Sequence, residues 1–455
     1  MLTPKQLFLS YFCLLLTPGL FAQNIRQLSA QQAVNVAIEN NVDVKNAKID
    51  LDIAKAKVWE ITGAGLPQVS GEVNLIHNLN IQRVILENGQ GPFTVEGVPQ
   101  GALIAFPFQL KNNAYAAVSL NQMLFNGSYL IGLKASRTYT QLAERSITQS
   151  KITTAENVMK AYYSALVAQE RSKIIDVNLS QLDSLLKDTR ILFQNGLVEK
   201  IDADRLEVQL NNLKTERFRV SKLISLSHYL LKLQMGIPVT DSVALTEKLS
   251  DFPLTSEPVD PTTFNVRSRI EFASLQTQRD LAVLDFKNIR SGYMPSLSGF
   301  ASVGANTAAT RFGDIPNVQD RWFNYSMVGV KLDVPIFDGF IKSFKMQQSK
   351  LSQKKIDNGF VALENAIRTE IIKASSDYAV YQANYQVQAR NMELAREVGR
   401  VAKIKYKQGV GTNLELTSAE SAIREAEINY YASVYDIIIA KIELDKATGK
   451  LYSGN

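Results

Sequence analysis

The sequence predicts a mixed α and β membrane protein, built from long antiparallel helices and four long amphipathic strands, with an internal two-fold repeat. Three observations support this fold class. Two long stretches of the chain contain no proline, four windows of about ten residues alternate polar and apolar side chains, and motifs of the first half recur in the second. With 455 residues the chain is long enough to bury sizeable hydrophobic cores.

Residues 1–22 predict a secretory signal peptide. Lys5 precedes an apolar stretch, and cleavage is expected after Ala22. The only cysteine, Cys13, lies in this segment, so the mature chain would hold no disulfide and no thiolate metal site. Beyond it, no apolar stretch is long enough for a membrane-spanning helix. We therefore expect a secreted, periplasmic or outer-membrane protein.

Long helices are expected in the proline-free stretches, residues 108–237 and 336–455. In the second stretch, apolar, small and aromatic residues recur at alternating spacings of three and four over residues 360–406 and again over 416–447. This spacing is typical of packed helices. The break at residues 409–411 predicts that the second helix returns antiparallel to the first.

The first proline-free stretch predicts a similar pair of helices. A helix from near Gly127 to Phe193 would be about 100 Å long at about 1.5 Å per residue. Asn195 and Gly196 interrupt the periodicity, which then continues through residues 206–231. We expect a second long helical hairpin here.

Four windows alternate in the manner of half-exposed strands: residues 69–81, 113–121, 296–306 and 325–334. Their length suits membrane strands, although a soluble pair of hairpins would alternate in the same way. Four strands are too few to close a membrane barrel, for which about eight is the minimum, so membrane strands would require oligomerisation. Aromatic residues near the strand ends resemble an interfacial girdle: Phe106, Phe108, Phe125, Trp322, Phe323 and Phe337.

The internal repeat predicts the domain organisation. Residues 66–71 (LPQVSG) recur as 294–299 (MPSLSG), and 120–127 (LNQMLFNG) recur as 332–339 (LDVPIFDG). The spacing between copies shrinks along the chain, so the first hairpin loop, around residues 82–112, must be the longer one. The expected parts are the signal (1–22), a first helix-hairpin-helix repeat (23–237), a Pro-rich linker (238–262), a second repeat (263–449) and a short tail (450–455).

Three segments carry a family resemblance: VPIFDG at residues 334–339, the Tyr406-x-x-Gly409 turn, and IAKIELDKATG at residues 439–449. With the duplication, the chain resembles the TolC-type outer-membrane efflux protein family. The resemblance implies a homotrimer with a twelve-stranded β-barrel in the outer-membrane lipid and an α-barrel of long helices that crosses the periplasm. It also implies a periplasmic adaptor protein and an inner-membrane pump as partners.

The expected function is therefore a passive outer-membrane channel of a tripartite efflux or secretion system. Two alternatives remain open at this point: a periplasmic coiled-coil rod without a channel, and a stand-alone diffusion porin. Nucleic acid is not an expected partner, because the net charge of +6 is spread along the chain without a basic cluster. His77 and His228 lack metal-ligand spacing, and no catalytic motif, cofactor site or metal site is expected.

The two turns between the long helices are the candidate docking sites for the adaptor. Gly196-Leu197 and Gly409-Val410 place an apolar side chain directly after a glycine that is expected to end a helix. Nothing nearby in the sequence would cover these side chains, so a partner's helical tips are the expected contact.

Asp202 and Glu415 are the candidate pore constriction. They are equivalent by repeat and lie just past the two turns, where a symmetric assembly would gather identical side chains into rings. The competing interpretation is helix capping, since Thr412 and Glu415 have capping-box spacing. The resemblance departs from its pattern at Glu199, where such proteins often carry Ser or Thr.

Overall fold

A computed structural model describes residues 26–89, 94–254, 260–316 and 322–452. The predicted signal peptide, residues 1–22, lies outside the described residues. The chain divides into two compact units. The helical unit comprises Met1–Asp50, Glu144–Ser274 and Phe360–Asn455, and the sheet unit comprises Leu51–Ala143 and Leu275–Gly359.

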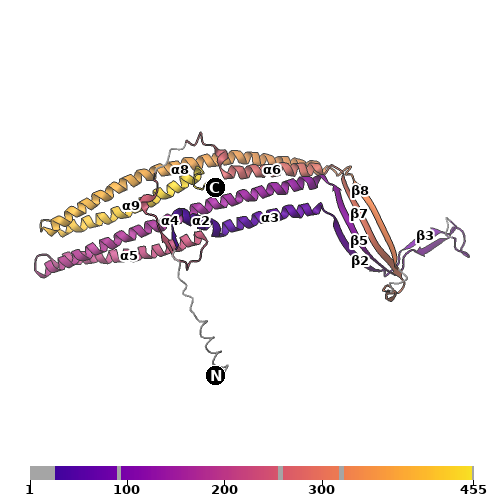
Figure 1. Cartoon of the computed structure of the whole chain (residues 1–455), viewed down its shortest axis with the longest axis horizontal. Coiled ribbons are helices and arrows are strands. Elements are labelled where there is room, and N and C mark those ends of the chain that lie inside the picture. The colour runs from indigo at the N-terminus through magenta and orange to yellow at the C-terminus, as the bar shows by residue number, and fades with distance from the viewer. Residues whose placement is uncertain (1–25, 90–93, 255–259, 317–321, 453–455) are drawn as a thin grey trace, which may run out of the picture. The chain divides into compact units, whose positions relative to one another are not determined.

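Long α-helices form where the proline-free stretches predict them (Figure 1). The expected helix from near Gly127 to Phe193 is confirmed as α4. Within the described ranges, no helix combines the length and apolar composition needed to cross a membrane. The helices are α2 (Ala30–Asn40), α3 (Val42–Ala64), α4 (Gly127–Gln194), α5 (Lys200–Met235), α6 (Ile270–Ser291), α8 (Ile341–Lys407) and α9 (Asn413–Ala447).

Local signals fix several helix ends in the helical unit. Ser29 and Gln32 form a reciprocal capping box at the start of α2, so two of its free backbone N–H groups are satisfied. Gly236 ends α5 with φ of 68°. A Cβ atom there would lie 2.6 Å from the carbonyl oxygen of Asn40, so only glycine fits both the backbone conformation and the close approach of the two segments.

Three hydrophobic clusters hold the helical unit together. One surrounds Tyr162, Leu231 and Met235, all fully buried, where α2, α4, α5 and α9 meet. A second runs along the α4–α5 hairpin and includes Leu206 of α5 and Leu416 of α9. The third joins α8 to α9, with fully buried side chains from both.

A small parallel ribbon closes the first cluster. Strand β1 (Arg26–Leu28) pairs with β6 (Val243–Leu245) in the linker region. The buried Tyr162 hydroxyl donates to the carbonyl of Leu28 at 3.0 Å, and the Glu247 carboxylate accepts from the backbone N–H of Ala30 at 2.8 Å. Two short 3-10 helices follow, η1 (Leu249–Asp251) and η2 (Val266–Ser268). The sequence did not predict this ribbon.

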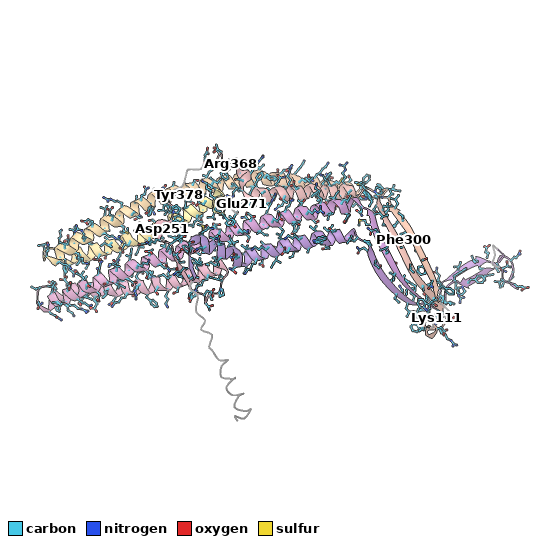
Figure 2. All side chains as sticks on the ribbon, in the orientation of Figure 1. Lys111, Asp251, Glu271, Phe300, Arg368 and Tyr378 are labelled. Atoms are coloured by element: carbon cyan, nitrogen blue, oxygen red, sulfur yellow. The ribbon has the colours of Figure 1, made fainter. Side chains whose placement is uncertain are left out.

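Two described parts of the linker contact α8, at Leu254 and at Pro261–Thr262. Figure 2 labels the two α8 side chains that fix it. Arg368 donates to the carbonyls of Pro261 and Thr262 at 2.5 and 3.0 Å, and the Tyr378 hydroxyl donates to the carbonyl of Leu254. The prolines therefore end regular structure here without leaving the described part of the linker detached from the helices.

The sheet unit contains one antiparallel four-stranded sheet, and the four predicted strand windows are confirmed. Its strands are β2 (Gln68–His77), β5 (Asn112–Phe125), β7 (Ser296–Ala309) and β8 (Phe323–Asp333). They lie side by side in the order β2-β5-β7-β8 (Figure 1), so β5 and β7, one from each half of the sequence, pair at the centre. Strands β2 and β8 are its edges.

The two faces of the sheet differ sharply in polarity. The registers Val69↔Leu120 and Leu120↔Ala301 align aliphatic residues across strands on one face. Many of these side chains are strongly exposed, including Val73 at 82% and Val328 at 85%. The opposite face carries Ser, Asn, Gln, Glu and Tyr residues. Exposed aliphatic rows on one face and polar rows on the other are typical of a strand between lipid and water.

An aromatic ring covers a glycine on the polar face. Phe300 of β7, labelled in Figure 2, pairs with Gly329 of β8. A Cβ atom at Gly329 would lie 2.6 Å from the tip of the Phe300 ring. The ring therefore lies across the neighbouring strand and takes the space that a side chain would fill, which is a known stabilising device in sheets.

The long first loop contains a ribbon that the sequence did not predict. Strand β3 (Arg83–Glu87) pairs with β4 (Leu103–Pro107), and the Asn88 side chain, 2% exposed, accepts from the N–H of Val95 at 2.8 Å and donates to the carbonyl of Val98 at 2.7 Å. The described residues of the second loop include the short 3-10 helix η3 (Phe312–Asp314). Figure 1 shows the ribbon beyond the end of the sheet that lies away from the helices of this unit.

Candidate functional site

The turn between α4 and α5 and the turn between α8 and α9 have the same backbone form. Gly196 and Gly409 adopt φ of 73° and 76°. In each turn the next N–H bonds back to a carbonyl inside the helix: Leu197 to Leu192 at 2.9 Å and Val410 to Lys405 at 3.1 Å. These are Schellman-type helix ends, as the glycines predict.

The apolar side chains of the turns are exposed. Leu197 is 69% and Val410 75% accessible. We call Gly196, Leu197, Gly409 and Val410 the hairpin tips. The geometry expected of the docking residues is present, and their role in docking stays a prediction.

Asp202 makes a contact between the two hairpins. Its carboxylate accepts a hydrogen bond of 2.6 Å from the side-chain amide of Asn413, which begins α9. Asn413 is only 5% exposed, and its amide oxygen has no hydrogen-bond partner among the described residues. A second contact near the tips joins Thr189 and Tyr406 through their hydroxyls at 3.4 Å.

Glu415 stays within its own hairpin. Its carboxylate pairs with Lys405 of α8 at 3.1 Å. Its backbone N–H, not its side chain, takes part in capping, by donating to the Thr412 hydroxyl at 3.1 Å. The structure therefore shows the Thr412 cap without the reciprocal bond of a capping box. At the equivalent position of α5, Glu199 makes no side-chain cap.

Further along the hairpins, a buried carboxylate joins three helices. Glu427 of α9 is 8% exposed and accepts from Asn178 of α4 at 2.8 Å and from Arg396 of α8 at 3.2 Å. Nearby, burial raises the pKa of Glu420, although Lys403 and Arg424 act in the opposite direction. Charges are thus buried along the seam where the two hairpins meet.

A second ionic cluster lies near the end of α9. Glu156, 8% exposed, pairs with Lys160 and Lys446, both at 2.9 Å, and Lys160 also pairs with Glu443 at 2.7 Å. Burial alone would raise the pKa of Glu156, but the two ammonium groups outweigh it and hold the pKa below its ordinary value. The cluster ties α4 to α9.

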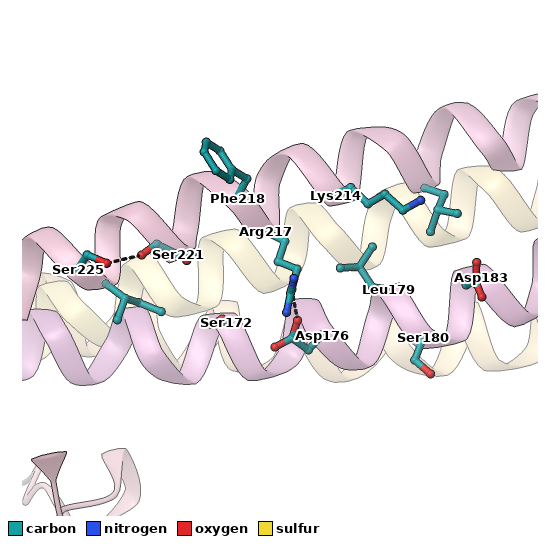
Figure 3. A pocket seen from close by; sticks show the side chains of 12 residues that line it. Ser172, Asp176, Leu179, Ser180, Asp183, Lys214, Arg217, Phe218, Ser221 and Ser225 are labelled. Carbon is teal, nitrogen blue, oxygen red and sulfur yellow. Dashed lines mark hydrogen bonds and ion pairs between the residues drawn. The ribbon is translucent and has the colours of Figure 1, made fainter.

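A groove of about 850 Å³ runs between α4 and α5. Figure 3 shows Arg217 of α5 reaching across to Asp176 of α4, at 2.5 Å, while Phe218 projects away from α4. Leu179 lies beside the ion pair (Figure 3), and Phe218 is 65% exposed. The groove is therefore a mixed apolar and ionic surface on the outside of one hairpin.

The polar face of the sheet provides a second candidate surface. The Tyr115 hydroxyl donates to Glu72 at 2.5 Å, and the hydroxyls of Ser119 and Ser302 lie 3.1 Å apart. Toward the end of the sheet away from the helices, this face forms a pocket of about 710 Å³ lined by residues from all four strands.

The sequence predicted Asp202 and Glu415 as candidate residues but not their partners. Lys405 has no distinctive sequence signal, and neither has Glu427. The repeat could have indicated Asn413, because it follows the N-cap at the position that Lys200 occupies in the first repeat. His228 accepts a hydrogen bond of 2.8 Å from Gln169, and burial lowers its pKa.

Comparison with protein families identifies one match that spans both halves of the chain. The model of a family described as "Outer membrane efflux protein" matches residues 33–218 and 268–450. The match leaves out residues 219–267, which include the predicted linker, residues 238–262.

Individual relatives agree with this match. The alkaline protease secretion protein AprF of Pseudomonas aeruginosa is 21% identical over 74% of this chain and 69% of its own. The outer membrane efflux protein BepC of Brucella suis is 21% identical over 91% of this chain and 84% of its own. The solved open state of the Neisseria gonorrhoeae MtrE outer membrane channel shares the fold, with a TM-score of 0.68 at 16% identity over 93% of this chain and 89% of that one.

Proposed function

Because the chain belongs to the outer membrane efflux protein family and functions in the outer membrane as an efflux channel, we propose that it assembles as a homotrimer and conducts solutes passively from an inner-membrane pump and a periplasmic adaptor to the exterior. The family match across both halves carries this proposal. The names of AprF and BepC, a secretion protein and an efflux protein, support a role in export.

The sheet supports the trimer. Its edge strands, β2 and β8, each pair with a single neighbour among the described residues, and the side chains of its aliphatic face are strongly exposed, as suits contact with lipid. An open edge within a membrane would leave backbone groups without hydrogen-bond partners, at a cost of several kcal/mol each. Three copies joined edge to edge would close a twelve-stranded barrel, with the polar face toward its lumen.

The hairpin tips support docking to an adaptor. Leu197 and Val410 are the exposed apolar side chains of two equivalent turns, which suits repeated contact with helical tips of a partner. We infer that the adaptor binds there.

The carboxylates beside the tips support a constriction. Three copies of Asp202 and of Glu415 near a common axis would form rings of carboxylates that favour the passage of cations. The carboxylates would repel one another as the ring narrows, unless cations lie between them. The Asp202–Asn413 bond joins the two hairpins of one chain, so its rupture would accompany any separation of the hairpins.

The test is photo-crosslinking in living cells with a cross-linkable residue at Leu197 or at Val410. The expected product is a covalent complex with a periplasmic adaptor protein. The control position is Tyr229, an exposed side chain of α5 far along the helix from the tips, where the adaptor should be absent from the products. If no adaptor is cross-linked at Leu197 or at Val410 in cells that still export, docking uses other residues.

A further inference from the structure

The pocket at the end of the sheet has a composition that differs from the rest of the polar face. It lies where β2 and β7 end and where β5 and β8 begin, away from the helices of the sheet unit. None of its lining side chains carries a charge at neutral pH. The lining instead combines aromatic rings with carboxamides, chiefly Tyr115, Phe323, Tyr325, Asn113 and Asn306.

The strand register brings these groups into adjacent rows. Asn306 of β7 lies between Tyr115 of β5 and Phe323 of β8. One row further along, Tyr325 pairs with Gly304. Carboxamides and aromatic rings therefore alternate across the sheet within a single chain.

The Tyr325 ring lies against the sheet. A Cβ atom at Gly304 would come within 2.9 Å of the Tyr325 hydroxyl, so the side chain lies across β7 and does not extend away from it. Tyr325 is half-buried, whereas Phe323 is 70% exposed. A ring held in this way offers one face to the pocket as a stacking platform.

Tyr115 is also held in place. Its hydroxyl donates to the Glu72 carboxylate at 2.5 Å, and Asn74 contributes a weaker bond of 3.4 Å. Glu72 lies outside the pocket lining, and its carboxylate is already used by this hydroxyl. The pocket therefore has fixed aromatic groups and no free counter-charge for a cation.

We propose that this pocket is a subsite for neutral polyhydroxylated solutes of the carbohydrate class, bound with their apolar C–H face on the rings of Tyr325 and Phe323 and their hydroxyls on carboxamides such as Asn306. A carboxamide offers both donors and an acceptor, which matches hydroxyl groups that both donate and accept. A few placed polar groups among aromatic side chains are typical of small-molecule sites. The proposal rests on the proposed function in one respect only, that this face lines the lumen at its outer end.

The binding test uses full-length protein in detergent and maltohexaose as the probe. The chain has two tryptophans: Trp322 packs against Ala114, which lines the pocket, while Trp59 lies on α3 and is 75% exposed. In a Trp59→Phe background, emission from Trp322 reports on the pocket. Maltohexaose should change this emission saturably, and Tyr325→Ala should weaken the apparent affinity by about tenfold.

Two further variants keep the test decisive. Asn306→Ala should also weaken binding, with loss of hydroxyl contacts but with both rings kept. Met327→Ala alters the same strand on the same face outside the pocket and should leave the affinity unchanged. Circular dichroism checks that each variant is folded, and if Tyr325→Ala is not, Asn306→Ala and Phe323→Leu carry the test.

The outcomes separate this inference from the proposed function. All lining residues belong to one chain, so binding does not require a conducting trimer. Absence of saturable binding by wild-type protein, or binding of tetraethylammonium with no binding of maltohexaose, would overturn the carbohydrate assignment even if the channel is confirmed. Saturable binding that Met327→Ala weakens as much as Tyr325→Ala would also overturn it.

Discussion

At the scale of single residues, the two candidate constriction carboxylates have different neighbours in the chain. Asp202 is held by Asn413 of the other hairpin, whereas Glu415 is held by Lys405 of its own. Asp202 is thus the residue whose contacts depend on how the hairpins meet. Glu415 can keep its partner when they separate.

We predict that Asp202→Asn combined with Glu415→Gln lowers the cation selectivity of reconstituted channels and weakens block by divalent ions. Both changes remove charge but keep an acceptor oxygen, so thermal stability should change little. Single-channel recordings in salt gradients provide the measurement.

Thr412→Ala is the matched control for this double variant. It removes the N-cap of α9 and should cost about 1 kcal/mol of stability without a change in selectivity. If the double variant behaves like Thr412→Ala, with lower stability and unchanged selectivity, the carboxylates are structural and the constriction lies elsewhere.

Glu420 gives a prediction about pH. Because burial raises its pKa, the folded state holds the proton more tightly than the unfolded state, and stability is lost as pH rises through the folded-state pKa. Glu420→Gln stays neutral, so it should unfold a few degrees above wild type at about pH 8, and the difference should vanish near pH 4. Glu425→Gln, which removes the same charge from the exposed side of α9, is the matched control in thermal unfolding.

At the scale of elements, the sequence predicted what local patterns determine. Proline placement and spacing of three and four predicted α4, α5, α8 and α9, and alternation predicted the four strands of the sheet. The turn glycines, Gly196 and Gly409, were predictable because a left-handed residue at a helix end favours glycine strongly.

Elements that depend on distant partners were not predicted. Strands β1 and β6 have only three residues each, and their pairing has no periodic signal. The β3–β4 ribbon lies in a loop rich in Gly and Pro, and both of its faces include exposed apolar residues, for example Val84 on one face and Ile85 on the other, so alternation is obscured. The Asp202–Asn413 bond joins residues 211 positions apart and could not be derived from either turn alone.

We predict that Leu197→Asp combined with Val410→Asp abolishes export while assembly and membrane insertion persist. Charged side chains at the hairpin tips would oppose burial against an adaptor but would remain hydrated in the free protein. The measurement is the minimum inhibitory concentration of a toxic solute that the channel exports, or the amount of a secreted solute in the medium. Leu197→Met combined with Val410→Ile is the apolar control. Normal export by the Asp variant would show that docking uses other residues.

At the scale of the whole molecule, the four-stranded sheet with its two open edges is the feature that predicts assembly with further copies of the chain. The family match favours a channel over a rod, and it also favours a duct that receives solutes from a pump over a stand-alone porin. The need for oligomerisation could be predicted from the strand count, because four strands are too few to close a membrane barrel, whereas the trimer is what the family resemblance implies.

We predict that detergent-extracted protein is a trimer of the mature chain. Light scattering coupled to size exclusion, corrected for bound detergent, measures its mass. Extraction should require detergent, and a proline in the edge strand β8, as in Val330→Pro, should release monomers. A stable wild-type monomer, or recovery from the soluble periplasmic fraction, would contradict the barrel.

The pairing of β1 with β6 has a consequence for the timing of biogenesis. Ala30 follows β1 and bonds to Glu247, 217 residues later in the chain. At a synthesis rate of about 5–20 residues per second, the partner of the first strand is made about 10–40 s after it. During this interval the start of the mature chain cannot complete its cluster, because Tyr162, Met235 and β6 must all follow. The start of the mature chain, which reaches the periplasm first, would thus depend on periplasmic chaperones for the longest time.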